Sequence, residues 1–196
     1  NKDDVIAWRG PILDRALTQL LADVHWGDLD YLLLDLPPGT GDIAMSLGQK
    51  VPTAEVLVVT TPQQAASEVA ERAGTMAALM NQKIIGVVEN MSWLAFTAPD
   101  TGKEYRIDLF GSGGGQEAAD ALSKRLGTEV PLLAQVPMDI ELRKGGDEGD
   151  PIVTAHPESP AAQAIVELAK NLDSRPRGLS GMHLGVCLLY TSDAAD

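Results

Sequence analysis

The amino-acid sequence predicts an α/β fold in which a mainly parallel sheet carries helices on both faces, giving three layers. Short apolar segments rich in β-branched residues alternate with longer segments whose apolar side chains recur every three or four residues. Such alternation is typical of parallel sheets covered by helices. The chain has 196 residues, 44% hydrophobic and 4% aromatic, so we expect residues 1–172 to form one domain with an aliphatic core.

The first half of the chain contains three expected strands and three expected helices. The expected strands are residues 31–36, 55–61 and 84–89, and the expected helices are residues 11–25, 42–49 and 63–81. The strand segments are continuous apolar runs, as in strands buried on both faces. Pro11 suits the first turn of the first helix, and Asp42 can cap the second.

The second half repeats the pattern after an irregular stretch. Residues 91–110 predict a loop or small hairpin that protrudes from the layers. The elements expected after it are helices at 116–126, 138–147 and 160–172, the last capped by Ser159, and a strand at 130–136. Residues 173–185 predict a flexible tail, and residues 186–196 resemble translated adapter or vector sequence, so we set them aside together with Cys187.

The composition excludes several classes of protein. The net charge is -13, which repels nucleic acid and anionic membrane surfaces, so neither partner is expected. No apolar run reaches the roughly 18 residues of a transmembrane helix. The single cysteine excludes an internal disulfide framework and fits a reducing compartment, so we expect a cytoplasmic protein.

The segment around Asp35 is the first candidate for chemistry. An acid at the end of a buried strand can hold a Mg²⁺-bound water, and the amides of Gly39 and Gly41 can approach a γ-phosphate. The alternative is a plain turn before a helix, with Thr40 or Asp42 as the cap. Both interpretations stay open on this short pattern.

Other candidates are weaker by themselves. Asn90 follows an expected strand and can pair with an adenine edge, but an asparagine also tolerates a left-handed turn. The glycine run 111–115 lacks the Lys-Ser/Thr of a phosphate loop and the context of a dinucleotide fingerprint, which favours a flexible loop before a helix. Asp139 and Arg143 flank the start of a helix. They can reach a nucleotide, although a surface ion pair is the simpler interpretation.

A series of motifs in consistent order gives these residues a context. They are WRGP at 8–11, WGDLDY at 26–31, DLPPGTGD at 35–42, TTPQ at 60–63, VVENMS at 87–92, FGSGGG at 110–115 and VPMD at 136–139. Together the motifs resemble the Mrp/NBP35-type, ApbC-like iron–sulfur cluster carriers, P-loop ATPases of the deviant-Walker group related to MinD and ParA.

The resemblance implies roles for particular residues. Asp35 corresponds to the Walker B acid, which acts on Mg²⁺ through water, and Asn90 to the asparagine that reads adenine. The family's γ-phosphate-sensing switch corresponds to Pro38, Gly39 and Thr40, and the loop bordering the base contains Pro137 and Asp139. The family works as a homodimer that uses ATP and Mg²⁺ and passes a labile iron–sulfur cluster to apo-proteins.

The chain departs from the family pattern at two places. No P-loop motif occurs, so we expect this chain to be the C-terminal part of such a protein, incomplete at the N-terminus, with a split sheet, no ATP hydrolysis and a tendency to aggregate. The Cys-x-x-Cys pair of cluster-binding members is also absent from residues 93–102, so the cluster is implied by family without its thiolate ligands.

These departures keep a second function open. A MinD/ParA-like regulatory switch would use the nucleotide without any cluster. A membrane-bound switch of that kind needs a C-terminal amphipathic helix, which residues 173–185 do not provide. A dehydrogenase is disfavoured because the dinucleotide fingerprint is absent.

Overall fold

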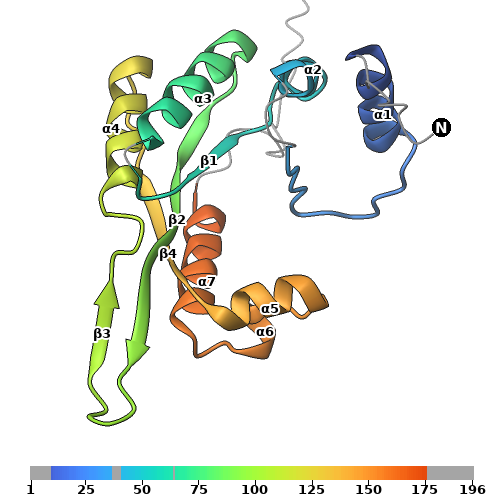
Figure 1. Cartoon of the computed structure of the whole chain (residues 1–196). Coiled ribbons are helices and arrows are strands. Elements are labelled where there is room, and N and C mark those ends of the chain that lie inside the picture. Colours follow the sequence, from blue (N-terminus) through green and yellow to red (C-terminus); the bar gives the residue numbers. More distant parts are fainter. Residues whose placement is uncertain (1–9, 37–40, 64, 176–196) are drawn as a thin grey trace, which may run out of the picture.

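The computed structural model describes residues 10–36, 41–63 and 65–175 (Figure 1). Its helices are α1 (Gly10–Ala22), α2 (Gly41–Lys50), α3 (Ala66–Met80), α4 (Gly114–Leu126), α5 (Ile140–Glu148), α6 (Ile152–Ala155) and α7 (Pro160–Asp173). Its strands are β1 (Val56–Thr60), β2 (Ile84–Thr97), β3 (Glu104–Ile107) and β4 (Leu132–Met138). The expected α/β class is therefore confirmed.

The sheet is parallel in its body and antiparallel at one protruding end. β2 lies in the middle and pairs in parallel with β1 and β4. The far half of β2 continues beyond the body and pairs antiparallel with β3, so residues 94–107 form the hairpin that the sequence predicts (Figure 1). β2 is longer than expected, because its outer half belongs to this hairpin.

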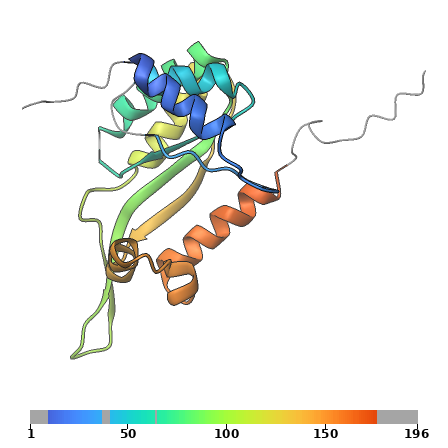
Figure 2. The same ribbon diagram turned by 90° about the vertical axis from the view of Figure 1, so that its right-hand side faces the viewer.

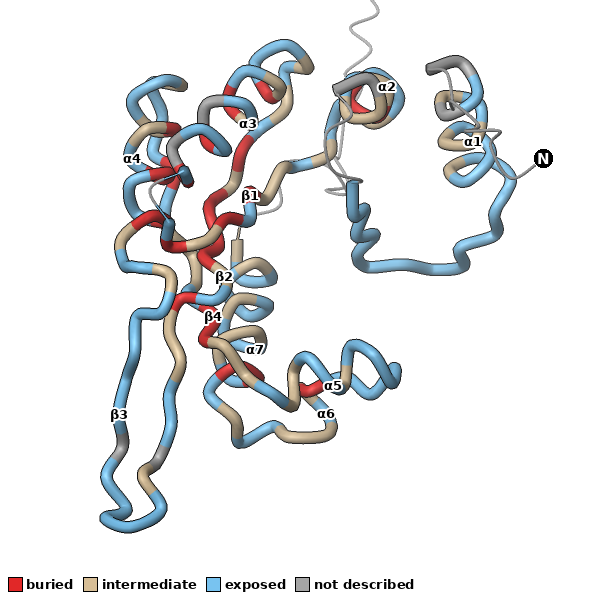
Figure 3. The backbone as a smooth tube through the Cα atoms, in the orientation of Figure 1, coloured by how far each residue is buried: buried red, intermediate tan, exposed pale blue. Residues whose placement is uncertain are grey.

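Helices cover the two faces of the sheet, as expected for three layers. Neighbouring residues of a strand face opposite sides, and β2 places Val87 in one core cluster and Val88 in another. The Val87 cluster is built with α3 and α4, and the Val88 cluster with α6 and α7. Figure 2 shows α7 on the side of the sheet away from α3 and α4. The buried residues lie on β1, on the parallel part of β2, near the end of β4 and on the helices that pack against these strands (Figure 3).

Most element boundaries agree with the sequence to within a few residues. Ser159 caps α7 as expected, since its Oγ accepts a hydrogen bond from the amide of Ala162 at 3.1 Å. The short helix α6 has no counterpart among the expected elements. Across the described ranges, no helix is long and apolar enough to span a lipid bilayer.

The expected strand at residues 31–36 is wrong. This segment has no regular secondary structure and all six residues are exposed, with Leu33 at 89%. The hydroxyl of Tyr31 donates a hydrogen bond to Asp173 Oδ1 at 2.5 Å, which places the segment beside the end of α7. A strand requires a hydrogen-bonding neighbour, and within the described residues none pairs with this segment or with the outer edge of β1. Apolar composition alone therefore does not make it a strand.

Candidate functional site

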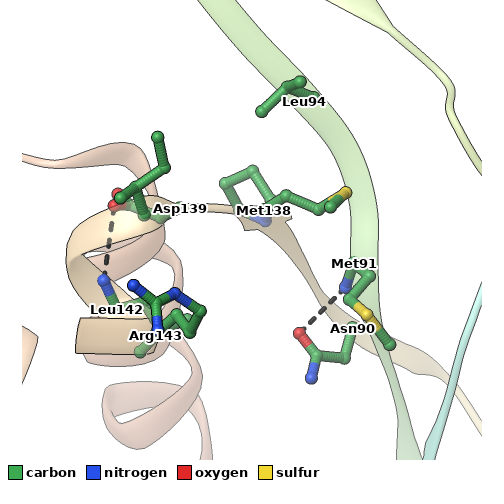
Figure 4. Close-up of a pocket in the computed structure, with 9 residues that line it drawn as sticks. Asn90, Met91, Leu94, Met138, Asp139, Leu142 and Arg143 are labelled. Atoms are coloured by element: carbon green, nitrogen blue, oxygen red, sulfur yellow. Dashed lines mark hydrogen bonds between the residues drawn. The ribbon is translucent and has the colours of Figure 1, made fainter. Parts of the chain in front are cut away.

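A cavity opens where β2 leaves the body of the sheet and where β4 ends at the start of α5 (Figure 4). Its volume is about 360 Å³, and its lining comprises Asn90, Met91, Leu94, Pro137, Met138, Asp139, Ile140, Leu142 and Arg143. The predicted site residues Asn90, Pro137 and Asp139 thus come together from two strand ends. The parallel pairing explains this, because Asn90 lies opposite Val136 in the register.

Asn90 lies at the start of a bulge in β2. The register advances from Asn90 opposite Val136 to Leu94 opposite Met138, so β2 contains two more residues than β4 over this interval. Met91 adopts a left-handed conformation with φ of 57°, and its amide donates a hydrogen bond to Asn90 Oδ1 at 2.8 Å. The carboxamide nitrogen of Asn90 is not used by this bond and is the group that can donate to a ligand.

Asp139 joins the pocket to helix α5. Its Oδ1 accepts hydrogen bonds from the amides of Glu141 at 2.8 Å and Leu142 at 3.4 Å, which makes it the N-cap of α5. These bonds fix the carboxylate at the rim of the cavity (Figure 4). Pro137, one residue before Met138 at the end of β4, is buried.

Arg143 is the cation among the lining residues. Its Nη1 donates to Asp147 Oδ2 at 2.9 Å, and both side chains are exposed. The simpler interpretation from the sequence, a surface ion pair of Arg143 with Asp139, is therefore wrong, because Asp139 caps α5 and Arg143 pairs with Asp147 instead. Arg143 also lines the cavity. An i,i+4 pair of this kind contributes little stability and leaves the guanidinium able to turn toward a ligand.

The magnesium side of the predicted site does not form among the described residues. Asp35 lies on the exposed, irregular segment and is not part of the cavity lining. Pro38, Gly39 and Thr40 lie outside the described residues. Within the described ranges, no group of three or more His, Cys, Asp or Glu side chains is placed to hold a metal ion.

The hairpin contains most of residues 93–102, the stretch where the family resemblance implies a Cys-x-x-Cys pair. Its two strands are held by aromatic contacts: Phe96 stacks on Tyr105 with ring centroids 5.3 Å apart, and Arg106 lies 4.0 Å from the centre of the Trp93 ring. No residue of the hairpin is a cysteine, so it offers no thiolate to an iron–sulfur cluster.

The apolar lining of the cavity was missed by sequence reasoning. Met91, Leu94, Met138, Ile140 and Leu142 all follow or flank expected strand ends, which is a usable signal because those ends share one edge of the sheet. The left-handed conformation of Met91 has no such signal, because methionine rarely adopts it.

Comparisons with known proteins find relatives of one family. A family model described as "ParA: NUBPL iron-transfer P-loop NTPase" matches residues 1–173. The "Iron-sulfur cluster carrier protein" of Mycobacterium leprae is 55% identical over 181 residues, covering 92% of this chain and 46% of that relative. The protein of the same description from Deinococcus radiodurans is 48% identical over 167 residues, covering 85% of this chain and 44% of its own. The chain spans about half the length of these curated relatives.

Solved structures give the same fold. The nucleotide-binding protein from Archaeoglobus fulgidus, in complex with ADP, matches with a TM-score of 0.55 and 35% identity over 71% of this chain and 53% of that chain. The septum site-determining protein MinD from Pyrococcus horikoshii, complexed with Mg-ADP, matches with a TM-score of 0.57 and 26% identity over 88% of this chain and 58% of its own. By the family model, by the carriers and by this shared fold, the chain belongs to the iron-transfer P-loop NTPases of the ParA group.

Proposed function

We propose that this chain contributes the base-binding pocket of an ATP-dependent iron–sulfur cluster carrier. The observation that carries the proposal is the convergence of Asn90, Pro137 and Asp139 on one cavity at the carboxyl ends of β2 and β4. That edge is where ligands bind in open parallel sheets. The two structural neighbours were solved with ADP, which supports an adenine nucleotide as the ligand.

The pocket offers the chemistry that an adenine base requires. Adenine presents ring nitrogens that accept hydrogen bonds and an amino group that donates them. Asn90 retains its carboxamide nitrogen as a donor, and Asp139 retains Oδ2 as an acceptor, because its cap bonds use Oδ1. The cavity volume of about 360 Å³ lies within the usual range for small-molecule sites, and its apolar walls can pack on the ring faces.

We assign the phosphate side of the site to the DLPPGTGD motif. In this proposal Asp35 would hold Mg²⁺ through a water, and Pro38, Gly39 and Thr40 would face the γ-phosphate in the whole protein. Because Asp35 is exposed on an unpaired segment, the described residues alone do not fit a magnesium ion. The P-loop, and a strand beside residues 31–36, would come from chain preceding Asn1.

The cargo and partners are proposed from the relatives. Their description as iron–sulfur cluster carriers supports transfer of clusters to apo-proteins. That the whole protein acts as a cytoplasmic homodimer is proposed from the family resemblance alone. The hairpin of this chain does not fit a cluster, since it has no thiolate. The ligands would therefore lie on other parts of the whole protein, and no transfer step is assigned to residues described here.

A second function, a nucleotide-driven regulatory switch without a cluster, is favoured by that same hairpin. Anaerobic reconstitution of the full-length protein with iron and sulfide separates the two. A stoichiometric charge-transfer absorbance supports the carrier. Retained ATPase activity without that absorbance supports the switch.

Calorimetric titration of the full-length protein with ADP tests the pocket. Replacing Asn90 by leucine removes the donor, so we expect ADP to bind about three- to ten-fold more weakly. Asn171→Ala, at an exposed position on α7, is the matched control and should leave the Kd unchanged. An unchanged Kd for Asn90→Leu would contradict the assignment of the pocket.

A further inference from the structure

Glu89 is a buried carboxylate that the proposed function does not use. Glu89 is 1% exposed, although it directly precedes Asn90, which lines the cavity. Its hydrogen-bond partners are neutral: the amide of Gly115 donates to Oε2 at 2.6 Å, and Gln135 Nε2 donates to Oε1 at 2.8 Å. Burying a carboxylate without a cation is costly, so its position calls for a specific role.

The two partners come from two different elements. Gly115 lies in the first turn of α4, and Gln135 lies on β4 directly opposite Glu89 in the register. One side chain therefore joins the start of α4 and the middle of β4 to the part of β2 that pairs in parallel. The amide of Gly115 that points at the carboxylate belongs to the N-terminal turn of α4.

The glycine run explains how closely these elements approach. A Cβ on Gly115 would lie 2.7 Å from Glu89 Cβ, and a Cβ on Gly114 would lie 2.6 Å from the carbonyl carbon of Pro62. Glycines are thus required for α4 to begin against Glu89 and against the turn that follows β1. The amide of Gly115 is already occupied by Glu89, so this run serves packing rather than phosphate binding.

The same residue also anchors the bulge that shapes the pocket. Ser92, 2% exposed, donates from its Oγ to the backbone carbonyl of Glu89 at 3.0 Å. Glu89 and Asn90 are the last regularly paired residues of β2 before the register shifts. The bulge at residues 91–93 therefore starts next to a residue that is held through both its side chain and its backbone carbonyl.

We propose that Glu89 is a positioning residue, which holds β2 just before its bulge so that the carboxamide of Asn90 faces the pocket. This role of Glu89 rests on the proposed nucleotide-binding function. Through Asn90, Glu89 would set the selectivity of the pocket for the base. Without the Glu89 side chain, α4 and β4 lose their common attachment to β2. The part of β2 before Asn90 then becomes mobile. Discrimination between bases falls more than the affinity that the phosphates of the nucleotide provide.

The test compares ADP with inosine diphosphate (IDP) in the full-length protein. Inosine replaces the amino group of adenine by a carbonyl, so the ratio of the two Kd values reports base reading alone. We expect Glu89→Met, which cannot accept either hydrogen bond, to lower the ADP preference about three- to ten-fold. Glu89→Gln should restore it, because the new amide oxygen accepts from Gly115 while Gln135 turns its own amide. Glu117→Met, exposed in the same turn of α4, is the matched control.

A second readout does not depend on nucleotide. The amide of Met91 donates to Asn90 Oδ1, so its hydrogen-exchange rate should rise in Glu89→Met and stay unchanged in Glu117→Met. If Glu89→Met does not fold, Gln135→Leu removes one of the two bonds from an exposed position and should give a smaller change in the same direction.

Two results would overturn the proposal. One is a folded Glu89→Met protein with the wild-type ADP-to-IDP ratio and unchanged Met91 exchange. The other is an equal loss of affinity for ADP, IDP and pyrophosphate, which indicates a general structural role. Failure of the proposed function looks different, since the wild-type protein would then bind neither nucleotide, and Met91 exchange would still decide the role of Glu89.

Discussion

Asp139 performs two tasks that substitution can separate. Its Oδ1 caps α5 through the amides of Glu141 and Leu142, and its Oδ2 remains for the base. Asp139→Ala removes both functions. Loss of an N-cap costs about 0.5–2 kcal/mol, and for a chain of this size each kcal/mol lowers Tm by about 2–4 °C. Asp139→Asn keeps a good capping oxygen but replaces the second oxygen by an amino group.

The two variants therefore give different patterns. We expect Asp139→Ala to lower both Tm and ADP affinity. Asp139→Asn should retain the Tm, bind ADP about three- to ten-fold more weakly and bind IDP more tightly, because its amino group can donate to the inosine carbonyl. Differential scanning calorimetry and isothermal titration of the full-length protein measure the two effects. An unchanged Tm in Asp139→Ala refutes the capping role, and an unchanged ADP-to-IDP ratio in Asp139→Asn refutes base contact by Oδ2.

Three further predictions concern the rest of the chain. Leu33→Lys should reduce self-association of the 196-residue chain in sedimentation experiments, because Leu33 is 89% exposed in an apolar segment; equal association of both proteins would contradict this. Asp35→Asn should abolish Mg²⁺-dependent ATP turnover in the full-length protein, and the 196-residue chain should show no turnover even with Asp35 in place. Turnover in either experiment opposes the assignment. Hydrogen bonds from Ser46 and then Lys50 lower the pKa of Asp14, so the contact between α1 and α2 is complete above the ordinary value of 3.8 and is lost as the pH falls through the lower folded value. Circular dichroism measured against pH should show a loss of helix signal in this range, and the Asp14→Asn variant should lack that pH dependence.

Local sequence patterns are sufficient to predict the part of the site formed by residues that follow strand segments. Asn90 and Asp139 follow segments whose composition favours strands, and parallel strands bring their carboxyl ends to one edge, so their meeting could be predicted. The helices other than α6 could be predicted for the same reason, since their apolar spacing is contained in each segment; α6 has only four residues, too few to show such a spacing.

Pairing between distant segments could not be predicted in this way. Residues 31–36 have the composition of a buried strand, but a strand also needs a neighbour, and within the described residues it has none. The bulge after Asn90 depends on the register between β2 and β4. The contact of Glu89 with Gly115 joins residues 26 positions apart, and no local pattern indicates it.

The continuity of β2 has a mechanical consequence. One strand forms the wall of the pocket and then becomes one arm of the protruding hairpin (Figure 1). From Met91 to Thr97 the arm is about 20 Å long at the usual rise of a strand. A rotation of about 10° at the bulge would thus swing the outer end by about 3 Å. Because the pocket and the hairpin share this strand, a change of angle at the bulge would displace the hairpin tip relative to the pocket.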